Sequence, residues 1–313
     1  MPLAAQNEVA LCANDVLRND VMLRINDVAL RANGISPSGL EKYRKLCYNK
    51  PKKGGDRMKS FCFTIDDNIR FFKEITEQNL KSIFDHPYLA MLARLHNKFG
   101  VKIQLNLFFK TDGFDLSQMS ERYADEWLAA ADWLKLSFHS EFENRNPYEH
   151  SGYDEVFGHC HAVQKQILRF ASPESLASTT TVHYCRTTDE GVAALADNGV
   201  RGLLGLFGTE ESPRTSYGID EPTAARLRGG ETVCVDGMAF ASIDMIINAV
   251  KKEKLLPNLE KLMTRKSIRV MIHEQYFYAD YHAYQPDFEE KLEIVLSALV
   301  DEGYQSVFFE ELL

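Results

Sequence analysis

The 313-residue sequence lacks the features that mark several large classes of protein. Its six cysteines contain no C-x-x-C pair, which argues against a zinc ribbon and against a dithiol redox centre. No stretch reaches the apolar length that a membrane span requires. Lys and Arg number 36 against 45 Asp and Glu, a net charge of −9. This shortage of positive charge argues against a general nucleic-acid binder.

The first residues also lack a positively charged start followed by an apolar segment, so no signal peptide is visible. Together with the scattered cysteines, this pattern predicts a cytoplasmic protein with reduced thiols and with neither a membrane nor a nucleic-acid partner. Hydrophobic residues make up 45% and charged residues 26% of the chain, as is usual for a globular protein.

Residues 1–58 differ in pattern from the rest of the chain. Short amphipathic segments are broken at Asn33-Gly34, and a basic stretch with two glycines at 50–56 marks a boundary. We therefore predict an N-terminal helical arm and linker over 1–58 and a separate domain over 59–313. The arm suits oligomerisation or packing against the main domain, and both interpretations stay open.

From residue 59 onward, apolar strand patterns alternate with helical ones about seven times. This alternation predicts a parallel sheet with helices outside it, and strands this apolar are buried on both faces. An α/β barrel, closed or nearly closed, is favoured over a doubly wound open sheet. The expected strands are 60–65, 101–109, 136–139, 179–184, 200–207, 268–273 and 305–309, and the expected helices are 69–99, 121–134, 153–170, 188–198, 259–263 and 288–300.

Asp and His side chains stand where several of these strands end. Asp66 and Asp67 end the first strand, and His139, His183 and His273 stand at or near the ends of three others. Chemistry in parallel α/β folds gathers at the carboxyl ends of strands. Asp and His are poor strand formers and costly to bury unpaired, so their recurrence there needs a reason. A divalent metal such as zinc binds both residue types and keeps one position open for water.

The two adjacent carboxylates can divide the work at such a site. One can hold the metal while the other takes a proton from the bound water, and a histidine on the opposite side can protonate the leaving group. Asp66-Asp67 also suit the N-cap of a helix beginning near Ile69, a role that Asp often takes. The pair alone favours neither interpretation.

Several of these segments resemble motifs of the polysaccharide deacetylase family, also called the NodB-homology domain. Thr64-Ile65-Asp66-Asp67-Asn68 resembles its T-F-D-D-G motif, and His139-Ser140-Glu141-Phe142-Glu143 resembles its H-S/T-x-x-H motif. Met271-Ile272-His273 is similar to the late L-x-H motif, and residues 299–313 are similar to the family's last helix, Gly-Tyr turn and strand. The resemblance covers residues 59–313.

This resemblance implies a distorted, seven-stranded (β/α) barrel that carries an N-terminal helical extension. The family removes an acetyl group from N- or O-acetylated sugars with a divalent metal, zinc first and cobalt, nickel or manganese as alternatives. By resemblance, Asp66 is the general base and His273 the general acid. Asp67 and His139 are metal ligands, and Glu143 is the third ligand.

Two departures from the family pattern lie close to these residues. Asn68 replaces a glycine, which changes the turn but not the chemistry. Glu143 stands where the family has its second metal-binding histidine. On a helical turn, its i, i+4 spacing from His139 would place both side chains on one face, and Glu141 is the fallback ligand. The added carboxylate would raise the pKa of the metal-bound water.

The arginine of the family's Arg-x-Pro-Tyr motif, which orients the general base, has no counterpart. Arg186 or His183 would take its place, and Asp244 would correspond to a later acidic motif. Aromatic side chains beginning at Tyr276 suit sugar stacking and loop anchoring equally.

The sequence therefore predicts a metal-dependent hydrolase of an acetylated carbohydrate, and two alternatives remain. A glycoside hydrolase on a related barrel would use a carboxylate pair from different strands. A carbohydrate-binding protein with a decayed site would keep the fold, and the departures at Glu143 and at the missing arginine make this alternative credible.

Overall fold

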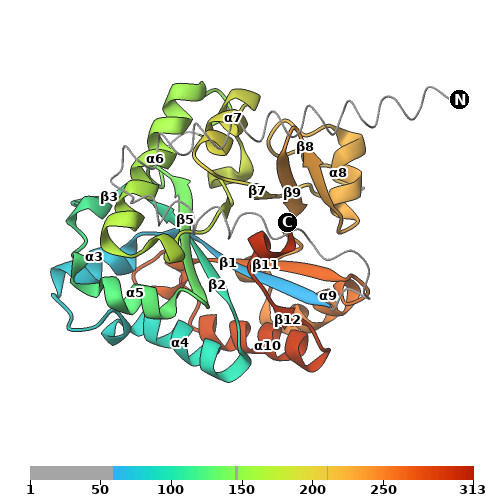
Figure 1. Ribbon diagram of the computed structural model, residues 1–313. Coiled ribbons are helices and arrows are strands. Elements are labelled where there is room, and N and C mark those ends of the chain that lie inside the picture. The colour runs from blue at the N-terminus through green and yellow to red at the C-terminus, as the bar shows by residue number, and fades with distance from the viewer. Residues whose placement is uncertain (1–58, 145–146, 210) are drawn as a thin grey trace, which may run out of the picture. The chain divides into compact units, whose positions relative to one another are not determined.

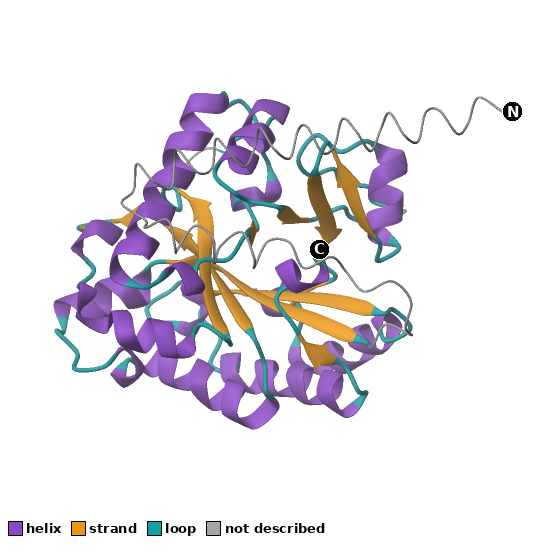
Figure 2. Cartoon of the chain, in the orientation of Figure 1, coloured by secondary structure: helices purple, strands orange, loops and turns teal. Residues whose placement is uncertain are grey.

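A computed structural model describes residues 59–144, 147–209 and 211–313, and the statements below concern these ranges. The predicted arm over 1–58, with its helices and its oligomerising role, lies outside them. Within the described ranges, parallel strands lie at the centre and helices lie around them (Figure 1). The same arrangement is visible by element type in Figure 2.

The larger sheet has the strand order β10-β11-β1-β2-β5, with β12 beside β1, and all its pairings are parallel. All nine residues of β1 and all six of β2 are buried, as expected for parallel strands covered on both faces. The strands are β1 (Ser60–Asn68), β2 (Ile103–Phe108), β5 (Leu134–Ser140), β10 (Met245–Ile246), β11 (Ser267–His273) and β12 (Gln305–Ser306).

A second sheet has the order β6-β7-β9-β8, in which only β8 runs antiparallel to its neighbour. The Ala177 N–H donates to the Leu136 carbonyl of β5, 2.9 Å away, and so joins β6 to the larger sheet. After β9 the chain continues into β10, which pairs with β11. These links connect β1, β2, β5, β6, β7, β9–β10 and β11 into a distorted parallel barrel, which confirms the predicted fold class. The strands are β6 (Thr179–Thr180), β7 (Gly202–Gly205), β8 (Thr232–Val235) and β9 (Met238–Ser242).

The remaining elements are helices, short 3-10 turns and one small hairpin, β3 (Lys110–Thr111) with β4 (Phe114–Asp115). The helices are α3 (Arg70–Glu77), α4 (Pro87–Phe99), α5 (Ala124–Ala130), α6 (Tyr153–Phe170), α7 (Asp189–Asp197), α8 (Glu221–Arg228), α9 (Leu255–Leu262) and α10 (Phe288–Asp301). The 3-10 turns are η1 (Ile83–Asp85), η2 (Leu116–Gln118), η3 (Glu121–Tyr123), η4 (Pro173–Ser175), η5 (His183–Cys185), η6 (Ile247–Ala249), η7 (Lys252–Lys254), η8 (Glu274–Phe277) and η9 (Phe309–Leu312).

The single helix expected over 69–99 is wrong, because the chain breaks it into α3, η1 and α4. Asn79 has a left-handed φ of 52°, which ends the first helix. Pro87 has no N–H and cannot stand inside a helix, but it suits the first position of α4. The strand expected over 179–184 is also shorter, because β6 ends at Thr180 and His183 begins η5.

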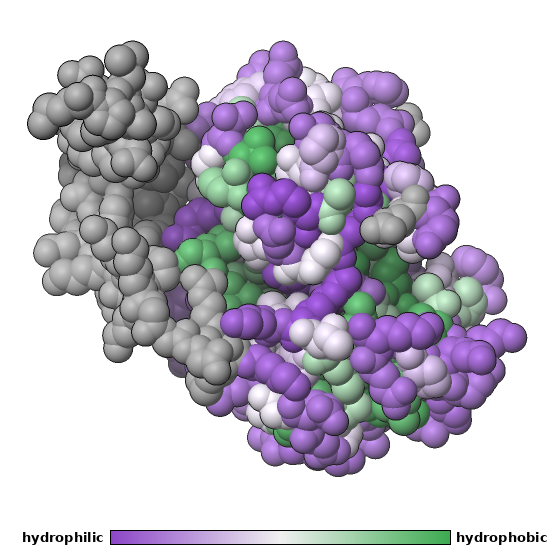
Figure 3. All heavy atoms as spheres, turned by 90° about the vertical axis from the view of Figure 1, so that its right-hand side faces the viewer, coloured by the Kyte–Doolittle hydropathy of each residue, from purple (hydrophilic) through white to green (hydrophobic). Residues whose placement is uncertain are grey.

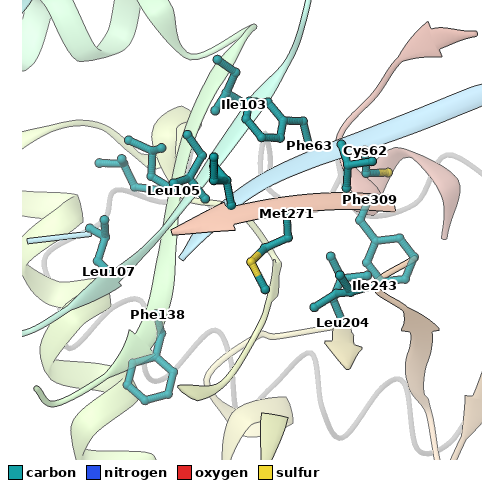
Figure 4. Close-up of a cluster of buried hydrophobic side chains, with 14 of the residues drawn as sticks. Cys62, Phe63, Ile103, Leu105, Leu107, Phe138, Leu204, Ile243, Met271 and Phe309 are labelled. Carbon is teal, nitrogen blue, oxygen red and sulfur yellow. The ribbon is translucent and has the colours of Figure 1, made fainter. Parts of the chain in front are cut away.

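Apolar side chains fill the space between the strands and the surrounding elements. Figure 4 shows part of this core, with Phe63, Ile103 and Leu105 from β1 and β2 close together. Cys62 belongs to the same core, as its place in an apolar strand predicts, and burial raises the pKa of its thiol to about 12. The four cysteines in the described part of the chain are free.

The face in Figure 3 carries mostly hydrophilic side chains, interrupted by smaller hydrophobic areas. Among the described helices, none is both long and apolar enough to cross a membrane.

Glu274 connects the end of β11 to the start of α3. Its buried carboxylate accepts hydrogen bonds from the backbone N–H groups of Ile69 (2.7 Å), Arg70 (3.1 Å) and Phe71 (2.8 Å), and from the Tyr278 hydroxyl (2.8 Å). These are N–H groups that a helix start leaves without an intrahelical partner. The contact fixes the segment after β1 relative to the segment after β11.

The Glu274→Gln variant is expected to change how stability depends on pH. Burial raises the pKa of Glu274 from 4.5 to about 7 in the folded protein, more than the backbone donors lower it. The stabilising contribution of a group with a raised pKa is complete below its unfolded-state value and is lost as the pH rises through its folded-state value. Between these two values the wild type should lose about 3 kcal/mol of unfolding free energy relative to the variant.

Denaturant unfolding at pH 4.5 and at pH 8 would measure this difference, with the exposed Glu302→Gln variant as the control. Parallel pH profiles for the wild type and the Glu274→Gln variant would contradict the prediction.

Candidate metal centre

A bulge at the end of β1 turns two adjacent carboxylates into the same region. The pairing of β1 with β2 shifts between Ile65 and Asn68, and Asp67 has a left-handed φ of 65°, which Asp tolerates better than most residues. In a regular strand, neighbouring side chains point to opposite faces. With the bulge, Asp66 and Asp67 are both buried, at 2% and 8% exposure.

Asn68 holds this bulge together. Its Nδ2 donates to the carbonyl oxygens of Ile65 (2.5 Å) and Asn106 (3.1 Å), and its Oδ1 accepts from the Tyr88 hydroxyl (3.1 Å). A glycine could make none of these contacts. The residue that replaces the family's glycine therefore has a defined role in shaping the turn.

Two histidines from different segments meet the Asp67 carboxylate. His139 lies near the end of β5, where a register shift against β2 leaves it without a strand partner. His183 opens η5, where Tyr184 and Cys185 both have left-handed φ values, 60° and 56°, and turn the chain away from a strand path. Such consecutive strained residues are typical of functional sites.

Backbone carbonyls fix which nitrogen of each ring carries the proton. The Nδ1 of His139 contacts the Thr181 carbonyl, and the Nε2 of His183 lies 3.0 Å from the Glu143 carbonyl. A carbonyl oxygen only accepts, so these nitrogens are the ones that carry N–H donors. The other two nitrogens, His139 Nε2 and His183 Nδ1, then point their lone pairs toward Asp67.

The three ligand atoms form a small triangle. His139 Nε2 lies 3.0 Å and His183 Nδ1 lies 3.3 Å from Asp67 Oδ1, and the two nitrogens are 3.0 Å apart. Two ligands of one tetrahedral zinc ion, each about 2.0–2.2 Å from it, lie about 3.3–3.5 Å apart. The observed edges are close to this value, so the residues fit a zinc-like ion.

The charges at the triangle also favour a cation. Burial lowers the pKa of His139, which keeps its ring neutral. Burial raises the pKa of Asp67, but hydrogen bonding with the His139 and His183 rings, which needs a proton on a ring nitrogen that faces the carboxylate, lowers it well below its usual range, so the carboxylate is ionised. When the ring protons lie instead on the nitrogens that face the backbone carbonyls, three acceptor atoms face one another, which is unfavourable unless a cation takes the place of that proton.

The candidate ligand cluster contains His183 and does not contain the predicted third ligand, Glu143. No helical turn follows His139, since β5 continues to Ser140 and a turn follows it, so the expected i, i+4 geometry with Glu143 is wrong. Glu143 contributes its backbone carbonyl to His183, while its side chain is exposed and outside the ligand cluster. The fallback ligand Glu141 pairs instead with Lys110 at 2.8 Å. His183, which the sequence predicted only as a supporting residue, is the third member of the cluster that could hold a metal ion.

Asp66 is oriented by an amide, where the sequence had predicted Arg186 or His183. The Nδ2 of Asn106 donates to Asp66 Oδ1 at 2.6 Å, while Arg186 forms an ion pair with Glu149. Burial and the neighbouring Asp67 charge raise the pKa of Asp66 well above its usual range, although the hydrogen bond lowers it.

The end of β11 supplies the other side of the site. His273 is the register partner of Asp66 on the adjacent strand, and its Nδ1 lies 2.9 Å from Asn248 Oδ1. Burial lowers the pKa of His273, while the Asp67 charge raises it. The Nε2 of Gln275 donates to Asp67 Oδ2 at 2.7 Å, which leaves Oδ1 for the ligand triangle. Sequence reasoning missed Asn106, Asn248 and Gln275.

Two other predicted residues have separate outcomes. Asp244 lies before β10, where it pairs with Arg265 and accepts the Arg269 backbone N–H at 2.8 Å, so it belongs to a buried ion cluster away from the triangle. Tyr276 does lie beside the site, with its ring centroid 6.0 Å from that of His273 and 5.3 Å from that of Tyr281.

Comparisons with known proteins show the fold. No family model matches the sequence, and no curated protein matches it. A 4-alpha-glucanotransferase from Thermococcus litoralis matches with a TM-score of 0.55 and 11% identity, over 82% of this chain and 40% of that chain. A protein from Mycobacterium smegmatis assigned as a polysaccharide deacetylase matches with a TM-score of 0.50 and 10% identity, over 84% and 91%.

A peptidoglycan N-acetylglucosamine deacetylase matches with a TM-score of 0.46 and 9% identity, over 82% of this chain and 89% of that chain. The chain spans less than half of the glucanotransferase but most of the two deacetylase structures. It therefore has the barrel fold found in polysaccharide deacetylases, with a buried Asp-His-His cluster at the ends of its strands that could hold a metal ion.

Proposed function

We propose that this protein is a metal-dependent hydrolase that removes an acetyl group from an acetylated carbohydrate. The main observation that supports the proposal is a set of three distances. Asp67 Oδ1, His139 Nε2 and His183 Nδ1 lie 3.0–3.3 Å from one another. Donor atoms of this kind suit zinc, and also cobalt, nickel or manganese. Asp66 and His273 flank this triangle from adjacent strands.

A zinc ion held there would lower the pKa of a water molecule and polarise the acetyl carbonyl. Asn106 donates to Oδ1 of Asp66, so the other oxygen, Oδ2, is the one assigned to accept the water proton. Asn248 holds the Nδ1–H of His273, so Nε2 is the nitrogen that passes a proton to the departing sugar nitrogen or oxygen. Asp66 and His273 thus act as base and acid.

The site favours deacetylation over glycosidic cleavage. A glycoside hydrolase needs two carboxylates on opposite sides of the scissile bond, about 5–10 Å apart. Here the two carboxylates are neighbours in the chain, and Asp67 is occupied by two histidines and Gln275. The likeness to a glucanotransferase concerns the fold, so it does not change this assignment.

Aromatic rings near the triangle suit the faces of a sugar. The Tyr184 ring lies 4.0 Å from the His183 ring and is 50% exposed. Tyr276 and Tyr281 continue from His273 on the other side. The matched peptidoglycan N-acetylglucosamine deacetylase acts on an acetylated amino sugar, as its name states, and supports the same substrate class here.

Removal of the metal is expected to abolish activity reversibly. The test is acetate release from N-acetylglucosamine oligomers and from acetylated xylan, before and after dialysis against a chelator. Acetate release should stop after dialysis and return when zinc or cobalt is added. Reducing ends without acetate would indicate a glycoside hydrolase, and sugar binding without turnover would indicate a decayed binding protein. Either result would reject the proposal.

A further inference from the structure

A buried chain of polar side chains leads from β6 through β2 and β5 to Asp66. Gln104, Asn106 and Ser137 are exposed by 2% or less. Gln104 and Asn106 are two residues apart in β2 and share one face, and Ser137 is the register partner of Asn106 in β5. Polar groups are costly in such a position unless each has a hydrogen-bond partner.

The contacts of this chain fix the orientation of the Asn106 amide. Its Oδ1 accepts from Gln104 Nε2 (2.8 Å) and from Ser137 Oγ (2.5 Å), so Nδ2 is the atom that faces Asp66. The Gln104 amide is fixed in turn, since its Nε2 donates to the Thr179 carbonyl and its Oε1 accepts from the Thr179 hydroxyl. A flipped Asn106 amide would place its oxygen against the Asp66 carboxylate and its NH2 group against the NH2 group of Gln104.

We propose that Asn106 is the positioning residue for the general base, and that Ser137 and Gln104 act through it. This proposal rests on the proposed function for its kinetic consequences. Asn106 supplies the hydrogen bond to Asp66 in the described part of the chain, and it is a neutral donor. The carboxylate is therefore aimed by a chain of amides and hydroxyls inside the barrel.

Three variants test the proposal in the full chain loaded with zinc. Asn106→Leu keeps the size and removes the donor, and kcat should fall about 100-fold, with KM within about threefold and zinc content unchanged. Ser137→Ala keeps Asn106 but frees its amide, and kcat should fall about fivefold. In the Asn106→Leu background, Ser137→Ala should have no further effect, because it acts through Asn106.

The matched control is Thr64→Val. Thr64 is buried two residues before Asp66 in the same strand, and its hydroxyl has no hydrogen-bond partner. The control therefore removes a buried polar group that takes no part in the hydrogen bonds among Gln104, Asn106 and Ser137. Its kcat should stay within twofold of the wild-type value. Equal losses for Thr64→Val and Asn106→Leu, or multiplying losses for Asn106→Leu and Ser137→Ala, would overturn the proposal.

A readout without turnover separates this proposal from the proposed function. In a crystal structure of the metal-free Asn106→Leu variant, the Asp66 carboxylate should leave the position seen in the wild type, while the same structure of Thr64→Val should keep it. An unmoved carboxylate would overturn the proposal even if the wild type releases acetate. If Asn106→Leu does not fold, the Ser137→Ala and Gln104→Leu structures decide, since both should rotate the Asn106 amide.

Discussion

Replacing Asp66 with asparagine is expected to lower kcat about 1,000-fold and to leave zinc binding intact. A positioned general base contributes about 10²–10⁴ in rate, and an amide cannot take the proton. Zinc binding should not depend on Asp66, because its described hydrogen bond goes to Asn106 and not to His139 or His183. Steady-state acetate release and zinc content, measured on the same preparation, test this.

The control for Asp66→Asn is Asp112→Asn, which makes the same chemical change at an exposed turn between β3 and β4. Its kcat should match that of the wild type. If Asp66→Asn retained most of its activity, Asp66 would not be the base. The structure leaves no helix-cap role for the pair, because Ile69 is the N-cap of α3 and Glu274 accepts the N–H groups there.

Replacing His183 with alanine is expected to weaken zinc binding at least 100-fold, whereas Glu143→Gln should change it by less than about threefold. Removing one of three protein ligands leaves the ion two, while loss of an outer partner alone typically costs 10–100-fold. Glu143→Gln keeps the backbone carbonyl that accepts from His183 Nε2, so the ring orientation survives. Competition with a chromogenic zinc chelator measures both affinities.

The reverse order of effects would restore the interpretation in which Glu143 is the third ligand. Loss of activity in His183→Ala without loss of zinc would also contradict the ligand assignment. His150→Ala serves as the control, because this histidine side chain is 91% exposed and its removal should leave zinc binding unchanged.

The sequence was sufficient for the barrel and for the strand-end positions of four residues. Apolar strands are recognised from the local sequence pattern. Once the strands are known, their carboxyl ends are known too, and active sites form there. Asp66, Asp67, His139 and His273 are found by that pattern, and the structure brings them together. The helix over 69–99 was wrong because periodicity continued across Asn79, where only the backbone shows the turn.

The third member of the candidate ligand cluster could not be found in this way. His183 reaches Asp67 because Tyr184 and Cys185 adopt left-handed conformations. These are held by distant contacts, among them the hydrogen bond from Arg214 to the Tyr184 carbonyl. The sequence pattern of a strand does not indicate such a turn at His183. The i, i+4 spacing of Glu143 from His139 therefore made Glu143 the predicted third ligand.

Asn106 did leave a signal in the sequence. In the segment Ile103-Gln104-Leu105-Asn106-Leu107, polar residues alternate with apolar ones inside a strand of a barrel that should be buried on both faces. Alternation of this kind places the polar groups on one face, which must be the barrel interior. Which polar partner they meet depends on the register of β2 with β1 and β5, and a single sequence does not contain that register.

The most direct test of the central claim is a crystal structure of the zinc-loaded protein, with the ion located by anomalous scattering at the zinc edge. The account predicts one zinc ion about 2.0–2.2 Å from Asp67 Oδ1, His139 Nε2 and His183 Nδ1, with Asp66 outside its ligands. Zinc bound through the Glu143 carboxylate, or bound elsewhere with the triangle left empty, would contradict it.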